Sequence, residues 1–104
     1  MTDPAEITRE DVDGGGVYSM EVEGAHRPAV LTWKARGEDG EIRLVDHTFT
    51  PPEARGKGIA AKLVEAIVAD AREQGFKIAP QCPYVVYAFG KHPEWEELRV
   101  PIPR

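Results

Sequence analysis

The period of the hydrophobic pattern changes at Pro51-Pro52, and this change restricts the chain to folds that combine a sheet with a helix. Before the prolines, apolar residues alternate with polar ones, which is typical of strands with one buried face. After them, apolar residues recur with the helical period. A chain of 104 residues has room for one hydrophobic core. We therefore expect one α+β domain over residues 1–104.

Three extended runs precede the prolines, and short turns join them. The runs are residues 18–22, 29–36 and 42–50. The first two place apolar side chains at alternate positions, and the third is rich in β-branched residues. Gly24 and the segment Gly37-Glu38-Asp39-Gly40 supply the turns, so we expect an antiparallel meander. Residues 6–9 either add an edge strand or stay irregular.

One long helix is expected from about Lys57 to Gln74. Its buried face would be an apolar stripe made of Ile59, Ala60, Leu63, Val64, Ile67, Val68 and Ala71. Charged residues take much of the remaining helix surface, namely Lys62, Glu65, Asp70, Arg72 and Glu73. Gly75 then supplies a C-terminal stop, because glycine readily takes the left-handed conformation that ends helices.

Shorter elements follow Gly75. Residues 76–79 form an extended run, and a strand reached through a helix normally lies parallel to the strand before that helix. We therefore expect residues 42–50 and 76–79 to pair. Residues 84–91 suit a short helix, although Val85-Val86-Tyr87 also suits a strand. The expected fold is a mixed, mostly antiparallel sheet with a long central helix and a short C-terminal helix.

Charge and composition exclude several classes of function. The formal net charge of -5 repels phosphate backbones, so no nucleic-acid partner is expected. No apolar run is long enough to span a membrane, and the acidic start is unlike a signal peptide, so we expect a cytoplasmic protein without a membrane partner. Cys82 is the single cysteine, which excludes an intramolecular disulfide. Together with the three histidines it shows no metal-ligand spacing, so no metal is expected.

The segment Arg55-Gly56-Lys57-Gly58 is the strongest candidate for a binding site. It leads into the long helix, whose free N-terminal amides and dipole favour an anion. The glycines permit close approach of a ligand, and the two basic side chains add charge, so a pyrophosphate fits well. The spacing is neither that of a nucleotide P-loop nor that of a dinucleotide fold. Alternatively, the segment is a plain glycine turn with two solvated basic residues.

This loop resembles the acetyl-CoA signature of the GNAT acetyltransferase superfamily through Arg55, Gly58 and Ala60. A fuller resemblance is to the short, stand-alone YjdJ-type branch of N-acetyltransferase-like proteins. The further features that carry it are His47-Thr48, Pro51-Pro52-Glu53, Ala71-Arg72 before Gly75, Pro80 before Cys82-Pro83-Tyr84, and Lys91-His92-Pro93-Glu94. These features extend in order from about Asp46 to Trp95, so the resemblance covers nearly the whole chain.

The resemblance implies a small GNAT-like fold with acetyl-CoA as cosubstrate. The pantetheine arm would lie in a V-shaped gap between the strands 42–50 and 76–79. The residues that would hold the pyrophosphate are Arg55, Gly56, Lys57, Gly58, Ile59 and Ala60, mostly through backbone amides. The backbone of Phe49 and Thr50 would pair with the pantetheine and orient the acetyl carbonyl.

Three residues are candidates for the chemistry at the acetyl group. The related branch carries a cysteine close to the thioester, so Cys82 is a candidate nucleophile, or else a small buried residue. His47 is a candidate base for the incoming amine, or else an inward-facing polar residue. Tyr87 is a candidate acid for the leaving thiolate, with Tyr84 or water as alternatives.

These features lead to three hypotheses for function. The first is an N-acetyltransferase that transfers an acetyl group from acetyl-CoA to a small amine or to a lysine-like acceptor, including a protein lysine. The second is a coenzyme A binding module with little or no turnover. The third is an interaction domain that binds no coenzyme A. For all three we expect a monomer or a weak homodimer.

Overall fold

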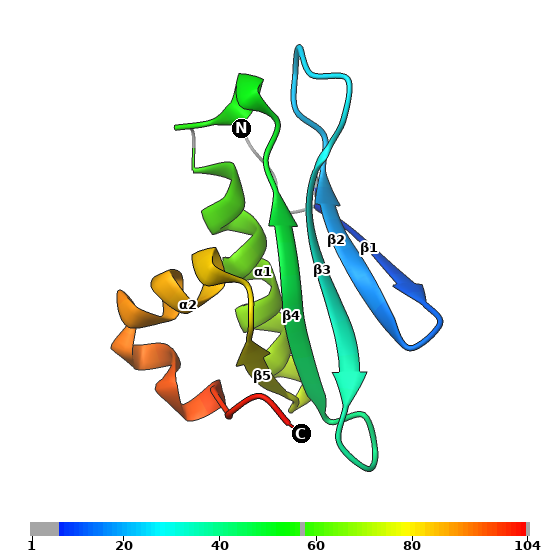
Figure 1. The fold of residues 1–104 in the computed structure, drawn as a ribbon, viewed down its shortest axis with the longest axis vertical. Helices are drawn as coiled ribbons and strands as arrows, with labels where there is room; N and C mark the ends of the chain where they lie inside the picture. The colour runs from blue at the N-terminus through cyan, green and yellow to red at the C-terminus, as the bar shows by residue number, and fades with distance from the viewer. Residues whose placement is uncertain (1–6, 57, 104) are drawn as a thin grey trace.

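The computed structural model describes residues 7–56 and 58–103, which form a five-stranded sheet with one long helix packed on one face (Figure 1). The strands are β1 (Ile7–Val12), β2 (Gly15–Met20), β3 (Ala29–Arg36), β4 (Ile42–Phe49) and β5 (Lys77–Pro80). The helices are α1 (Ile59–Gln74) and α2 (Pro83–Gly90), with the short 3-10 helices η2 (Pro52–Ala54) and η3 (Pro93–Leu98). The predicted α+β class is confirmed.

The sheet follows chain order from β1 to β5. Strands β1 to β4 pair as an antiparallel meander, and β4 pairs with β5 in parallel through the crossover helix α1. Both arrangements were predicted. The edge strand β1, left open by the sequence, is present and extends to Val12. Among the described residues, no helix is long and apolar enough to cross a membrane.

Strand β2 starts earlier than predicted, because two glycines belong to it. Gly15 and Gly16 are buried and pair with Lys34 and Trp33 of β3. A Cβ at Gly16 would lie 2.6 Å from the Trp33 ring, so only glycine leaves room for that indole. Val22, predicted as a strand residue, lies beyond the end of the strand at Met20.

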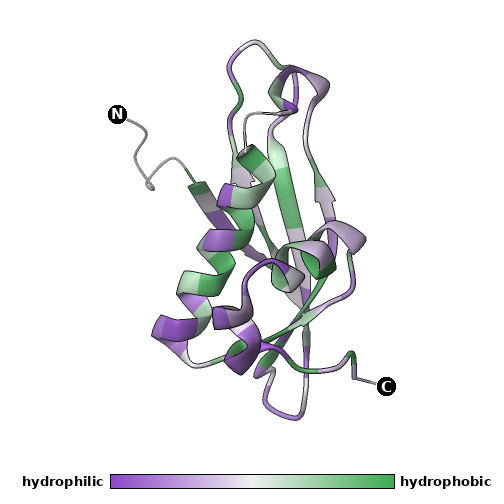
Figure 2. Cartoon of the chain, turned by 90° about the vertical axis from the view of Figure 1, so that its left-hand side faces the viewer, coloured by the Kyte–Doolittle hydropathy of each residue, from purple (hydrophilic) through white to green (hydrophobic). Residues whose placement is uncertain are grey.

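The core lies between the sheet and α1. Most of the predicted apolar stripe is buried, and Leu63, Val64 and Ile67 are fully buried in the core. Burial of such a side chain stabilises the fold by about 1.5–3 kcal/mol. Figure 2 shows the apolar and polar residues of α1 alternating as expected for a helix with one covered face. Gly75 ends the helix at φ 87°, as predicted, with its N–H donating to Ala71.

The segment after β5 is helical, as preferred from the sequence. Pro83 occupies the first turn of α2, where a missing N–H costs nothing, and Cys82 is the N-cap. The following η3 contacts both α1 and α2. Its Trp95 ring packs edge-on against Phe89 of α2, with 5.2 Å between the ring centroids. This contact joins α2 to η3.

Asp70 corrects one prediction, because it is buried although it was assigned to the charged surface of the helix. It is 8% exposed and accepts hydrogen bonds from Tyr18 Oη at 2.6 Å and Arg9 Nε at 2.7 Å. Burial and the bond to Asp70 raise the pKa of Tyr18, and the carboxylate raises the pKa of Arg9. Arg43 Nη1 donates to Tyr18 Oη at 2.9 Å, so the network links β1, β2, β4 and α1.

We expect Asp70→Ala to lower the free energy of unfolding by about 2–3 kcal/mol. Removing one partner of a buried ion pair usually costs about 3–5 kcal/mol, and the half-exposed Arg9 reduces that figure. Urea unfolding measures the change, with Glu73→Ala on the exposed surface of α1 as control. A loss no larger than that of the control would show that the network does not stabilise the fold.

Candidate active site

The loop from β4 to α1 contains two glycines in left-handed conformation. Gly56 has φ 82° and Gly58 has φ 72°, a region that side chains with a Cβ enter only at a cost of about 1–2 kcal/mol. Nothing lies within 4 Å of the position of a Cβ at either glycine. The loop therefore turns an open backbone surface outward.

The start of α1 is free to bind an anion. Gly58 is the N-cap, and among the described residues no side chain caps the helix and no acidic residue occupies its first turn. The amides at the start of a helix lack partners within it, and the helix dipole adds positive potential there. Arg55 contributes an exposed guanidinium to the same loop. Lys57, predicted as part of this site, lies outside the described residues.

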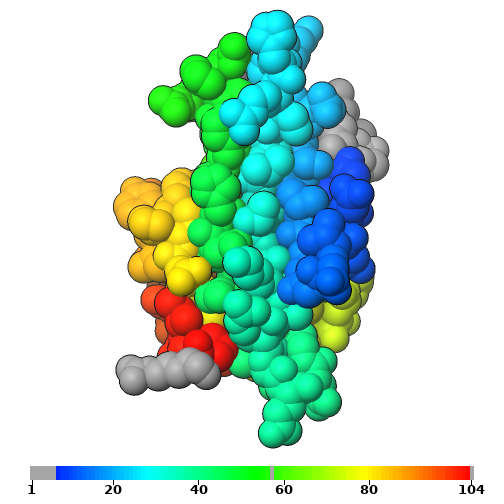
Figure 3. Space-filling view, turned by 45° about the vertical axis from the view of Figure 1, so that its right-hand side comes forward, coloured from blue at the N-terminus to red at the C-terminus, as the bar shows by residue number. Residues whose placement is uncertain are grey.

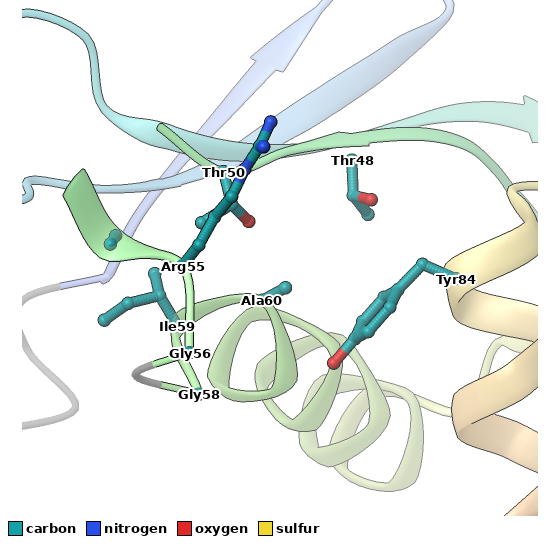
Figure 4. Close-up of a pocket in the computed structure, with 9 residues that line it drawn as sticks. Thr48, Thr50, Arg55, Gly56, Gly58, Ile59, Ala60 and Tyr84 are labelled. Carbon is teal, nitrogen blue, oxygen red and sulfur yellow. The ribbon is translucent and has the colours of Figure 1, made fainter. Parts of the chain in front are cut away.

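A cleft of about 270 Å³ opens above this helix start (Figure 4). Its lining residues are Thr48, Thr50, Ala54, Arg55, Gly56, Gly58, Ile59, Ala60 and Tyr84. Six of the eight residues predicted to bind coenzyme A therefore meet in one cleft. The ring of Phe49 lies instead under the Arg27 guanidinium, 4.2 Å from it, so only the Phe49 backbone remains a candidate contact.

Strands β4 and β5 separate at the inner end of this cleft. Their pairing ends at Val45 and Pro80, and the Val45 carbonyl accepts hydrogen bonds from the amides of Gln81 and Cys82, both at 3.0 Å. Beyond Val45, β4 continues to Phe49 with no strand of the described chain on that side. The resulting gap is the V-shaped opening that the sequence resemblance implied.

Cys82 lies at this split. Its side chain is 8% exposed, and Sγ is 3.4 Å from Oγ1 of Thr48, which lines the cleft. The structure thus places the thiol beside the inner end of the cleft without making it part of the lining. Its role as nucleophile stays a prediction.

His47 is not on the cleft side of β4. A β-bulge at Asp46 shifts the alternation, so that Val45 and Thr48 face α1 while His47 pairs with Thr32 on the opposite face. His47 is exposed there, so it is not the inward-facing polar residue considered as the alternative. The structure separates it from the lining of the cleft.

Tyr84, rather than Tyr87, reaches the cleft from α2. Figure 4 shows the Tyr84 ring extending from the first turn of α2 toward the start of α1. Tyr87 lies one turn farther along the helix, is 60% exposed and does not line the cleft. Burial, with smaller contributions from Tyr87 and Glu65, raises the pKa of Tyr84. The hydroxyl therefore stays protonated at neutral pH.

Within the described chain, no group of three histidine, cysteine or acidic side chains could hold a metal ion.

Comparison with known proteins agrees with this geometry. The family model of the GCN5-related N-acetyl-transferase matches residues 17–98. The fold is similar to the NMR solution structure of a GCN5-like protein from Staphylococcus aureus, with a TM-score of 0.66 and 21% sequence identity. That likeness covers 96% of this chain and 94% of the other. Because the family match includes every residue that lines the cleft, the chain belongs to the GCN5-related N-acetyltransferase family.

Proposed function

We propose that this protein is an acetyl-CoA-dependent N-acetyltransferase whose acceptor is a small amine or a lysine-like side chain. One observation carries the proposal: a single cleft extends from the uncapped start of α1 to Thr48, on the part of β4 that lies beyond its pairing with β5. In coenzyme A the pantetheine arm separates the pyrophosphate from the thiol. The molecule therefore suits a cleft with a site for an anion at one end and a free strand edge at the other.

The pyrophosphate would rest on the loop at the start of α1. Gly56 and Gly58 leave open space where side chains would stand, and the first amides of the helix point at that space. Arg55 would add a charge-assisted hydrogen bond. These features fit an anionic ligand, and the glycine conformations fit a close approach of the backbone to it.

The pantetheine and acetyl group would follow the free edge of β4. Backbone amides and carbonyls beyond Val45 on that edge are available to pair with the pantetheine amides, much as a strand would. Bound acetyl-CoA supplies an acyl group activated as a thioester. The acetyl group would lie near Thr48 and Cys82, whose Oγ1 and Sγ are 3.4 Å apart beside the split.

Tyr84 is our proposed general acid, in place of Tyr87. Arg55 and Tyr84 are the titratable residues in the described lining of the cleft, and arginine does not release its proton at neutral pH. When the amine nitrogen bonds to the acyl carbon and the carbon–sulfur bond breaks, the Tyr84 hydroxyl would protonate the departing thiolate. The amine must also lose a proton.

The acceptor would reach the split from the uncovered face of the sheet. Figure 3 shows the strands exposed on this face, with α2 beside them rather than over them. His47 lies on this face, so it stays our prediction for the base that takes the amine proton. The net charge of -5 favours a cationic acceptor.

We expect Gly58→Asp to weaken acetyl-CoA binding about 10- to 100-fold, because the new carboxylate would stand at the helix start where the pyrophosphate binds. Isothermal titration calorimetry measures the affinity. Gly58→Asn is the matched control, since it imposes the same left-handed strain without the charge and should bind more tightly than Gly58→Asp. Equal affinities for the wild type and Gly58→Asp would refute the site.

We expect Tyr84→Phe to lower kcat by about 100-fold, as for the loss of a general acid, with little change in acetyl-CoA affinity. The pKa of Tyr84 lies above its ordinary 10.0, so the wild type should lose no activity through this group up to about pH 10. Above that pH the wild type should lose activity as Tyr84 ionises, whereas Tyr84→Phe should lack this decline. An unchanged kcat would assign the proton to water. Tyr87→Phe is the matched control and should keep its kcat.

Release of free thiol separates an enzyme from a binding module. We expect thiol to appear when wild-type protein and acetyl-CoA meet a panel of cationic amines, and intact-mass spectrometry would show whether Cys82 carries an acetyl group. If acetyl-CoA binds and no amine releases thiol, the protein is a binding module. If Cys82→Ala keeps full activity and wild-type Cys82 stays unmodified, transfer is direct.

A further inference from the structure

A second hollow, of about 240 Å³, lies where strands β1 and β2 meet the C-terminal part of α1. Trp33 of β3, Arg43 of β4, and Asp70 and Gln74 of α1 are among the residues that line it. Ala60 lines the cleft and Gln74 lines the hollow, so the two sites are about 21 Å apart along the axis of α1. The proposed transfer reaction does not use this hollow.

Arg43 is held in a fixed position at this hollow. Its guanidinium carbon lies 3.9 Å from the centroid of the Trp33 ring and 4.0 Å from that of Phe76. Nη1 donates a hydrogen bond to Tyr18 Oη. The described residues contain no buried side-chain nitrogen without a partner, so the other N–H groups of this half-buried arginine are open to solvent. A guanidinium has five N–H donors, and most of these are therefore available to a ligand.

The charge of Arg43 has no acidic partner within the described chain. Asp70 lines the same hollow, but its carboxylate already accepts hydrogen bonds from Arg9 at 2.7 and 3.2 Å and from Tyr18 at 2.6 Å. Asp70 therefore neutralises Arg9 and leaves the charge of Arg43 uncompensated. A guanidinium fork matches the two oxygens of a carboxylate, so Arg43 suits a carboxylate ligand.

Two carboxylates of β1 also line the hollow, namely those of Glu10 and Asp11. Both side chains are exposed, and in the part of the chain that the structure describes neither forms an ion pair with Arg43 or with any other cation. These carboxylates would repel a simple anion and attract an ammonium group. The hollow thus offers uncompensated charges of both signs, which suits a ligand that also carries both.

We propose that the hollow between β1, β2 and α1 binds a free amino acid or a similar small zwitterion. The ligand carboxylate meets the guanidinium of Arg43, and the ligand ammonium meets Glu10 and Asp11. A bound ligand would link β1 to β4 beside α1 and would stabilise the fold by mass action. Because the hollow is distant from the cleft, this ligand is not the acceptor of the proposed reaction, and the site does not depend on that reaction.

The test follows the indole N–H signals of the two tryptophans by NMR. Trp33 lines the hollow, whereas Trp95 packs against Phe89 in η3 and serves as the internal reference. The ligands are glycine, 4-aminobutyrate and 6-aminohexanoate, which differ in the spacing of their charges, with butyrate and butylamine as analogues that lack one charge. At least one zwitterion should shift the Trp33 signal saturably at millimolar concentration and leave the Trp95 signal unchanged.

Butyrate and butylamine should each bind at least about 10-fold more weakly than the best zwitterion, because each lacks one charge-assisted hydrogen bond. If none of the three zwitterions shifts the Trp33 signal, the site is overturned. If butyrate binds as tightly as the best zwitterion, the hollow is a plain anion site and the amino-acid assignment is wrong.

Variants test the two halves of the site separately. Arg43→Lys keeps the charge but lacks the fork, so it should weaken zwitterion binding about 10-fold, whereas Arg36→Lys, an exposed arginine outside the hollow, should bind like the wild type. Glu10→Gln combined with Asp11→Asn changes only exposed side chains and should remove the preference for the zwitterion over butyrate. An unchanged preference would overturn the ammonium contact. This double variant should bind acetyl-CoA like the wild type.

Discussion

The carbonyl of Val45 determines where this sheet opens. It accepts hydrogen bonds from the amides of both Gln81 and Cys82. The parallel pairing of β4 with β5 ends at this point, and the chain turns into α2. The bulge at Asp46 begins at the next residue and turns Thr48 toward α1. The Val45 carbonyl therefore sets two features of the site, the split and the position of Cys82, and the adjacent bulge sets a third, the side chain at the inner end of the cleft.

Helix α1 stabilises the fold and carries the proposed anion site, and its two ends are built differently. The C-terminal half is fixed by buried apolar residues and by the Asp70 network with Arg9 and Tyr18. At the other end, Ile59 and Ala60 are only half-buried and Gly58 offers no capping side chain. A capped start would be more stable by about 1 kcal/mol, but it would occupy the amides that we propose bind the pyrophosphate. Packing farther along the helix offsets that loss.

The sequence predicted the elements whose signals are local, and it missed those decided by contacts between distant residues. Alternation predicted β3, the helical stripe and Gly75 predicted α1, and the glycine loop predicted most of the cleft.

The burial of Asp70 depends on Tyr18 and Arg9, and the strand at Gly16 depends on room for Trp33, which no local pattern reveals. The side of β4 on which His47 lies depends on the bulge, because unbroken alternation would place it with Val45. Tyr84 rather than Tyr87 lines the cleft, because which face of α2 meets the cleft depends on how the helix packs, and propensity does not show this.

If coenzyme A is the ligand, as we propose, this acidic chain must bind it through local electrostatic fields. The net charge of -5 disfavours coenzyme A at long range, but salt screens such a field over about 8–10 Å. At the start of α1, the helix dipole, the free amides and Arg55 would attract the ligand over a few ångströms. Their attraction would therefore outweigh the screened repulsion by the net charge. The acidic residues elsewhere repel a second anion and attract a cation. This division of charge would bring donor and acceptor to different faces of the same split, which is the arrangement that acyl transfer between them requires.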